Sequence, residues 1–180
     1  MIVEGYVIVS ANGMLADSRH VMPDALKFPQ DQAFFEAALD QADLIVHGLH
    51  SHEQQTRSNQ RRRLVLTRRI AALAPDTEFP NATLWNPRGA SFEDACKHAG
   101  VMSGKVAIIG GPAVYALFLD RYDAFWLSQA HGVTIEAGLG VFPQVPELSP
   151  QQILTRHGLF AREARALDAA NDVDLTVWRR

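Results

Sequence analysis

A pair of adjacent glycines is the feature of this sequence that most clearly indicates chemistry. Gly110 and Gly111 follow the apolar run Val106–Ile109 and precede Pro112. That order is typical of a buried strand, a tight turn and a helix start, because proline suits the first helical position. Glycine has no Cβ, so the turn can approach a ligand closely while the free N–H groups of the next helix face a phosphate. The pattern predicts a nucleotide-phosphate site, and an ordinary strand-to-helix turn is the alternative.

Three other groups of residues could carry chemistry, and the sequence favours a plainer interpretation for each. His47, His50 and His52 are close together, but no cysteine is near and a strand-to-loop crossing points such side chains apart, so we expect no metal site. The arginines at 61–63 have no interleaved aromatic residues, and the net charge is -3, so we expect no nucleic-acid partner. Cys96 is in an expected helix and favours packing over nucleophilic chemistry.

Length and composition limit the class of protein. The chain has 180 residues, 47% of them hydrophobic and 21% charged, which is typical of one globular domain, here residues 1–180. The single cysteine allows no internal disulfide and is consistent with the cytoplasm. The start lacks a basic segment, and the apolar stretch from Tyr6 is too short to cross a bilayer, so we expect no membrane partner.

The elements that must position these residues alternate between strands and helices. Asp31 is a plausible N-cap for a helix over 32–41, and Pro23 and Pro29 would break any helix before it. Ser91 is expected to cap a helix that ends at His98. Further helical signals cover 112–119, and strand signals cover 2–10, 44–48, 64–67, 82–85, 106–109, 124–128, 153–163 and 173–178.

This alternation predicts an α/β fold: a three-layer α/β/α arrangement with a central, mostly parallel mixed sheet and an antiparallel C-terminal edge. The last two expected strands would form that edge. In such a sheet, ligands gather at the carboxyl ends of the parallel strands.

The order and spacing of these segments resemble the dihydrofolate reductase family over nearly the whole chain. The most specific element is Ile109-Gly-Gly-Pro-Ala-Val-Tyr115, which matches the pattern Ile-Gly-Gly-x-x-x-Tyr. The resemblance includes the first strand running into 11–16, the acid before Phe34 and Phe35, and Leu175-Thr-Val-Trp178. The reductase domain of riboflavin biosynthesis shares this fold and is the nearest competitor.

The resemblance implies that Asp31 is the buried acid that hydrogen-bonds a pterin ring and promotes its protonation. A hydride adds poorly to an uncharged C=N bond, and a proton supplied to the nitrogen removes that obstacle. Burial in an apolar pocket would raise the pKa of the acid toward the operating range. Ser128 occupies the place of a family threonine that hydrogen-bonds the acid, and it retains a hydroxyl.

The resemblance also implies a nicotinamide cofactor: NADPH, with NADH as the alternative. Arg68 would bind the 2′-phosphate, and Tyr115 would lie near the nicotinamide. Leu49 replaces a basic family residue after Gly48, which weakens the case for NADPH over NADH. The full set of expected cofactor-binding residues is Ala11, Gly13, Gly48, Ser51, Thr67, Arg68, Gly110, Gly111, Ala113, Val114 and Tyr115.

On the substrate side, the resemblance assigns contacts to Phe35 and to Arg61, which falls near the family arginine that binds the folate carboxylate. Leu26 stands where the family has an aromatic residue, so a true folate is a less secure substrate than the reductase fold itself. We therefore expect a cytoplasmic reductase, monomeric or homodimeric, that acts on a pterin- or folate-like heterocycle. The alternatives are a riboflavin-pathway reductase acting on a ribosylated pyrimidine and a non-catalytic nucleotide-binding relative.

Overall fold

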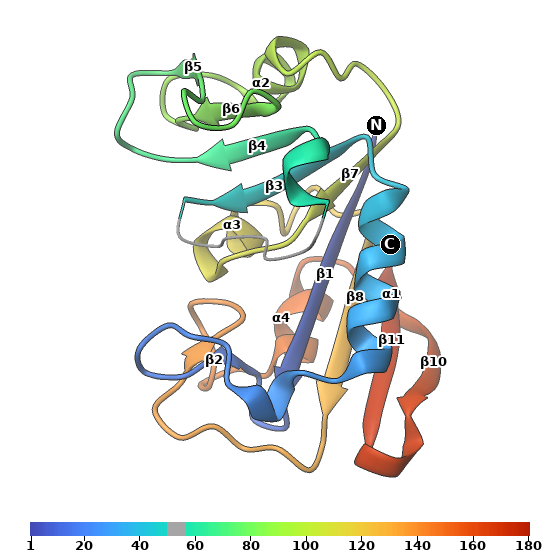
Figure 1. Cartoon of the computed structure of the whole chain (residues 1–180). Helices are drawn as coiled ribbons and strands as arrows, with labels where there is room; N and C mark the ends of the chain where they lie inside the picture. Colours follow the sequence, from blue (N-terminus) through green and yellow to red (C-terminus); the bar gives the residue numbers. More distant parts are fainter. Residues whose placement is uncertain (50–56) are drawn as a thin grey trace.

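The central structure is a mixed sheet that runs through the whole molecule (Figure 1). A computed structural model describes residues 1–49 and 57–180. The strands of this sheet are β1 Ile2–Ser10, β3 Leu44–Gly48, β4 Arg63–Leu66, β5 Leu73–Pro75, β6 Ala82–Trp85, β7 Lys105–Ile108, β8 Ala124–Ala130, β10 Phe160–Asp168 and β11 Val173–Arg179. Their order across the sheet is β10-β11-β8-β1-β7-β3-β4-β6-β5.

The six inner strands from β8 to β6 are parallel, so their carboxyl ends lie along one edge of the sheet. Strands β11 and β10 run antiparallel at one side, and β5 runs antiparallel at the other. The predicted mixed sheet with an antiparallel C-terminal edge is therefore confirmed. Strand β5 was not expected, because Leu73–Pro75 is short and ends in a proline, which only an edge strand tolerates.

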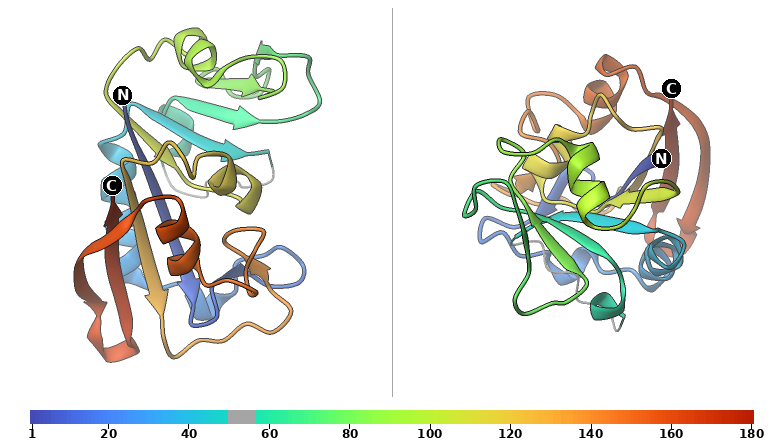
Figure 2. Two further views of the ribbon diagram at one scale, coloured as in Figure 1. Left: turned by 180° about the vertical axis from the view of Figure 1, so that it is seen from behind. Right: turned by 90° about the horizontal axis from the view of Figure 1, so that it is seen from above.

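Helices cover both faces of the sheet, as the two opposite views show (Figures 1 and 2). Helix α1, Pro29–Asp40, packs Leu39 and its half-buried aromatic residues against Tyr6 and Ile45 on one face. On the other face, α2 Phe92–His98, α3 Pro112–Leu117 and α4 Pro150–Arg156 join the larger apolar core. These layers confirm the predicted three-layer α/β/α architecture. Single 3-10 turns cover Asp24–Leu26, Ser58–Gln60 and Ala169–Asn171.

The start of α1 differs from the sequence-based expectation. The helix begins at Pro29, with Phe28 as its N-cap, so Pro29 starts the helix and does not break it. Its fixed φ and missing N–H suit the first helical position. Asp31 is therefore the third residue of the helix and not its cap. Helix α2 begins as expected, because the Ser91 side chain accepts a hydrogen bond from the backbone N–H of Asp94.

The expected strand over 153–163 is wrong in its first half. Ser149 and Gln152 form a capping box that starts α4 at Pro150, and Ile153 becomes one of its buried residues. Gly158 then adopts a φ of +77°, which ends the helical segment before β10 begins at Phe160. An apolar run of this length does not by itself separate a buried helix from a strand.

A second, two-stranded sheet pairs β2, Met14–Ala16, with β9, Leu139–Gly140. It lies beyond the carboxyl end of β1 and joins two connections that are far apart in the sequence (Figure 1). The sequence shows no strand signal at either segment, since both strands are too short to show a period. None of the helices within residues 1–49 and 57–180 is long and apolar enough to cross a membrane.

Candidate functional site

Asp31 lies buried between α1 and the sheet, close to Ser128 on β8. Asp31 is 8% exposed and Ser128 is 2% exposed. Burial raises the pKa of the Asp31 carboxyl above its ordinary value, and a hydrogen bond from Ser128 acts in the opposite direction. Burial is the larger of these two effects, because it disfavours the charged form. Asp31 is thus an acid that holds its proton more firmly than a solvated aspartate, and the hydroxyl of Ser128 lies beside it.

Tyr115 connects this acid with the glycine turn. Its hydroxyl donates a 2.7 Å hydrogen bond to the backbone carbonyl of Tyr6 on β1. Burial raises the pKa of Tyr115, and the negative charge of Asp31 raises it further, which places the two side chains within electrostatic range. The Tyr115 ring also lies 3.3 Å from the point where a Cβ on Gly110 would be. The acid, the tyrosine and the turn are therefore neighbours.

The first residue of the glycine turn, Gly110, has a backbone conformation that other residues adopt poorly. Gly110 has a φ of +119°, and the peptide bond between Gly110 and Gly111 is cis. The N–H of Gly48 donates a 2.7 Å hydrogen bond to the carbonyl of Gly110, so the ends of β3 and β7 meet at this turn. The expected cofactor residues Gly48, Gly110 and Gly111 thus lie together at the carboxyl edge of the sheet.

Helix α3 starts directly after the turn, with Gly111 as N-cap and Pro112 as its first residue. The first helical hydrogen bonds run from the amides of Val114 and Tyr115 to the carbonyl of Gly111. The N–H of Ala113 therefore precedes the hydrogen-bonded part of the helix. The Val114 side chain is buried in the core and its N–H bonds to Gly111, so neither group is available to a ligand.

The turn between β1 and β2 forms another part of the same edge. The N–H of Ala11 donates to the carbonyl of Val133, and the side-chain amide of Gln129 donates to the carbonyl of Ala11. Gly13 has a φ of +81°, and a Cβ there would lie 2.9 Å from Pro150. Packing against α4 therefore explains the glycine at position 13 without a ligand.

The expected adenosine side is more exposed. Thr67, directly after β4, is 8% exposed, and its hydroxyl accepts a hydrogen bond from the backbone N–H of Arg69. Arg68 and Arg69 are exposed at the same edge. Leu49 is half-buried, and its N–H bonds to the carbonyl of Leu66. The expected contact Ser51 lies outside the described residues.

The two residues expected to contact substrate lie along α1. Phe35 is half-buried and packs with the cluster that contains Tyr6 and Leu39. Arg61 reaches the far end of the helix, where its guanidinium is 2.6 Å from a carboxylate oxygen of Asp40. Asp40 is about 14 Å along the helix axis from Asp31, at 1.5 Å per residue. The structure therefore separates Arg61 from the acid by most of the length of α1.

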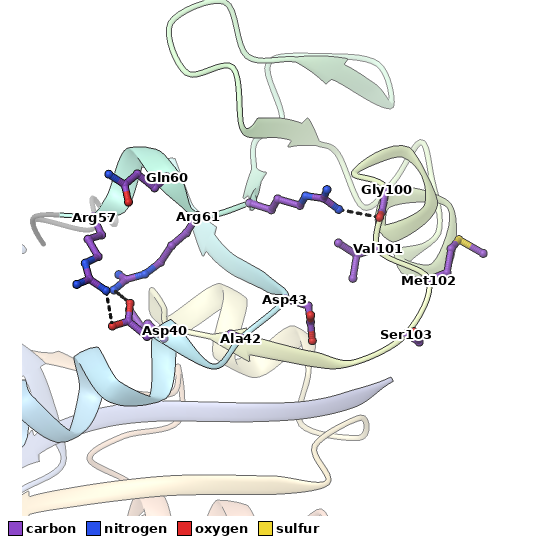
Figure 3. Close-up of a pocket in the computed structure, with 12 residues that line it drawn as sticks. Asp40, Ala42, Asp43, Arg57, Gln60, Arg61, Gly100, Val101, Met102 and Ser103 are labelled. Carbon is purple, nitrogen blue, oxygen red and sulfur yellow. Dashed lines mark hydrogen bonds and ion pairs between the residues drawn. The ribbon is translucent and has the colours of Figure 1, made fainter.

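Arg61 borders an open pocket of about 560 Å³ at the amino ends of β3, β4 and β7 (Figure 3). Arg57 and Arg61 converge on Asp40 at one side, with distances of 3.2 and 2.6 Å. The backbone of 100–103 forms the other side. This pocket is at the opposite edge of the sheet from the glycine turn.

Sequence reasoning missed one polar side chain of the site region, that of Asn12. Its amide bonds to both backbone polar groups of Ile135. The dipeptide Asn12-Gly13 is a turn signal, and that was the only local sign of its role. Among residues 1–49 and 57–180, no three histidine, cysteine or acidic side chains group as metal ligands. Of the histidine cluster, His47 is buried on β3, while His50 and His52 lie outside the described residues.

No protein-family model and no curated protein matches this sequence. Solved structures do match it. A structure described as a riboflavin biosynthesis protein from Shewanella sp. PV-4 superimposes with a TM-score of 0.69 at 15% identity, covering 100% of this chain and 99% of that one. Dihydrofolate reductase from Enterococcus faecalis, complexed with NADP(H) and RAB-propyl, gives a TM-score of 0.65 at 17% identity, covering 99% of this chain and 96% of that one.

A third match is a Thermotoga maritima diaminohydroxyphosphoribosylaminopyrimidine deaminase/5-amino-6-(5-phosphoribosylamino)uracil reductase, with a TM-score of 0.68 at 13% identity. Here 99% of this chain covers 56% of the longer protein. At these identities, the comparisons show the fold. The chain has the dihydrofolate-reductase-like fold, which confirms the resemblance inferred from the sequence.

Proposed function

We propose that this protein is a nicotinamide-dependent reductase that transfers a hydride to a pterin- or folate-like heterocycle. The observation that carries the proposal is the buried pair of Asp31 and Ser128, within electrostatic range of Tyr115 and beside the glycine turn. Burial of an acid is costly for the folded state, and such groups cluster at functional sites.

The glycine turn fits a cofactor phosphate. Gly110, which is buried, and Gly111, which is half-buried, form the backbone where β3 and β7 meet, and a Cβ on Gly110 would crowd Tyr115. The residues that would hold the cofactor are the turn with the amide of Ala113, the β1–β2 turn, and Thr67 with Arg68. When bound there, a nicotinamide cofactor supplies the hydride.

Asp31 supports that transfer by holding a proton. Its raised pKa keeps the carboxyl protonated to a higher pH than an exposed aspartate. The carboxyl donates its proton to a ring nitrogen while the neighbouring carbon accepts the hydride, so the C=N bond gains two hydrogens. Ser128 orients the carboxyl, and solvent returns the proton to Asp31. Phe35 would pack against the ring. Arg61, which pairs with Asp40 at the opposite edge of the sheet, would be too far from the ring to take part in this step.

The second candidate is a reductase acting on a ribosylated pyrimidine. It is favoured by the riboflavin biosynthesis protein and the phosphoribosylaminouracil reductase, whose TM-scores of 0.69 and 0.68 are slightly above the 0.65 of the dihydrofolate reductase. Such a substrate carries a phosphate, which would need basic contacts in addition to an acid at the ring.

One parallel assay distinguishes these functions. NADPH oxidation is measured with dihydrofolate, with dihydrobiopterin and with the riboflavin-pathway ketone, and NADPH affinity is measured by calorimetry. Turnover with a pterin supports the first proposal, and turnover with only the ketone replaces it with the second. NADPH binding without turnover on any of the three would contradict both and favour a non-catalytic relative.

A further inference from the structure

The turn between β1 and β2 is held by an unusual side-chain bridge. The Asn12 amide nitrogen donates a 2.9 Å hydrogen bond to the carbonyl of Ile135, and the N–H of Ile135 donates to the Asn12 amide oxygen at 3.2 Å. The two bonds form the same reciprocal pairing that neighbouring backbone strands make. The Asn12 side chain thus takes the place of a backbone-paired residue between segments that are 123 residues apart.

The bridge continues into β1 through Ser10. The Ser10 hydroxyl donates a 2.6 Å hydrogen bond to the Asn12 amide oxygen and accepts one from the N–H of Met14 at 3.0 Å. Ser10 is fully buried at the end of β1. Each polar atom of the Asn12 and Ser10 side chains therefore has a partner, and the network spans the turn from its first residue to the start of β2.

Backbone and glutamine contacts hold the rest of the turn. The N–H of Ala11 bonds to the carbonyl of Val133 at 2.7 Å. The Gln129 amide donates to the carbonyl of Ala11 at 3.1 Å, and Gln151 on α4 donates to the Gln129 amide oxygen at 2.8 Å. The two glutamine bonds tie the turn to β8 and α4, while the Ala11–Val133 bond and the Asn12 bridge both tie it to the β8–β9 connection.

Ser128, the partner of Asp31, pairs with Ile8 on β1, so the β1–β2 turn is the part of the proposed cofactor site that lies on the side of the acid. We propose that Asn12 is a positioning residue that fixes this turn so that the reacting, nicotinamide end of the cofactor is held in register with Asp31. The inference rests on the proposed nicotinamide-dependent function. Asn12 acts through the backbone of the turn, and it leaves the adenosine end, at Thr67 and Arg68, to bind independently. Loss of the bridge should therefore weaken the hold on one half of the cofactor only.

The substitution Asn12→Asp tests this with almost no change in shape. The carboxylate retains the acceptor for Ile135 N–H and Ser10, but it replaces the donor with an oxygen that faces the Ile135 carbonyl. When the new carboxyl takes up a proton it becomes a donor again, so the lost bond returns at acidic pH. The pKa of that carboxyl should lie above the ordinary value of about 3.9, because its charged form faces a carbonyl oxygen.

The experiment compares Asn12→Asp with the parent by calorimetry, using NADPH and its adenosine half, 2′,5′-ADP, over a range of pH. We expect NADPH affinity to fall about tenfold at neutral pH, as for a partly buried hydrogen bond that is left unmade. The affinity should recover as the pH falls, and binding of 2′,5′-ADP should match the parent at every pH. The matched control is Asn81→Asp, which also removes an amide donor to a backbone carbonyl, that of Asn59, away from the turn.

Two results would overturn the inference. One is a parent-like NADPH affinity of Asn12→Asp at neutral pH, and the other is an equal, pH-independent loss for NADPH and 2′,5′-ADP, which a general structural defect would cause. Failure of the proposed function is a different result, since it is seen in the parent itself, which would then either bind neither NADPH nor 2′,5′-ADP or bind NADPH without turnover. Thermal unfolding of both variants and the parent shows whether the fold is retained.

Discussion

The two sides of the candidate site differ in the kind of group that would act on a ligand: side chains on one side and backbone on the other. On the acid side, the proposed proton transfer depends on the buried side chains of Asp31 on α1, Ser128 on β8 and Tyr115 on α3. The pKa of Asp31 depends on how these side chains pack. On the glycine-turn side, the proposed phosphate binding depends on backbone groups at the ends of β3 and β7, and Arg68 adds an exposed charge. Proton transfer by a side chain should therefore be lost when that side chain is replaced by one of the same shape. Phosphate binding by backbone groups should be lost only when a substitution adds atoms at the turn.

The largest effect is expected from Asp31→Asn. Asparagine retains the shape and the contact with Ser128 but cannot supply a proton, so turnover should fall by about 10²–10⁴-fold, the usual contribution of general acid catalysis. The rate of the parent should also fall as the pH rises through the raised pKa of Asp31, and the variant should lose this dependence. Steady-state rates with the substrate found by the parallel assay check both expectations.

The control for this substitution is Asp24→Asn. Asp24 is an exposed acid whose pKa is lowered by its hydrogen bond to Lys27. Its replacement should leave turnover unchanged. An Asp31→Asn protein as active as its parent would remove Asp31 from the mechanism.

A smaller effect is expected from Arg68→Ala. Loss of one charge-assisted contact with the 2′-phosphate should weaken NADPH binding about ten- to hundred-fold and leave NADH binding nearly unchanged. Calorimetric titration with both cofactors measures the difference, and Arg156→Ala provides an exposed arginine at the end of α4 as control. Equal losses for NADPH and NADH would show that Arg68 does not contact the 2′-phosphate.

Gly111→Val tests the backbone side directly. Gly111 has a φ of -77°, which any residue adopts, so the fold should persist. The added side chain should keep the phosphate from the turn and lower cofactor affinity by about tenfold, equivalent to 1.4 kcal/mol. Gly132→Val is the matched control, because a Cβ there meets nothing within 4 Å. Unchanged affinity in Gly111→Val would mean that the turn does not hold the phosphate.

The smallest effect concerns stability. Because the folded-state pKa of Asp31 is raised, this carboxyl contributes stability below its unfolded-state pKa, and that stability is lost as the pH rises through the folded value. Asp31→Asn should therefore unfold at a higher temperature than the parent at neutral pH, and the difference should vanish in acid. Melting curves across pH test this; a constant difference at every pH would contradict the assigned burial effect.

Much of the fold follows from local patterns. The β-branched run at β1, the cap at Ser91 and the glycine pair before Pro112 each depend on residues adjacent in the chain, and the structure has them where they were predicted. The errors occur where local signals compete. Pro29 can break a helix or start one, and the run around Ile153 suits a helix or a strand, so only the packing partner decides.

The amino-acid sequence by itself determined the alternation of strands and helices, and hence the edge of the sheet at which a ligand would bind. Tertiary structure alone decided that Arg61 meets Asp40 at the far end of α1 and that Asn12 bridges to Ile135. The burial of Asp31 beside Ser128 was expected only from the family resemblance, and no local pattern of residues predicts it. The physical reason is the distance along the chain over which each interaction acts. Helix starts and turns depend on neighbouring residues, whereas desolvation and bridging hydrogen bonds depend on groups that only the folded chain brings together.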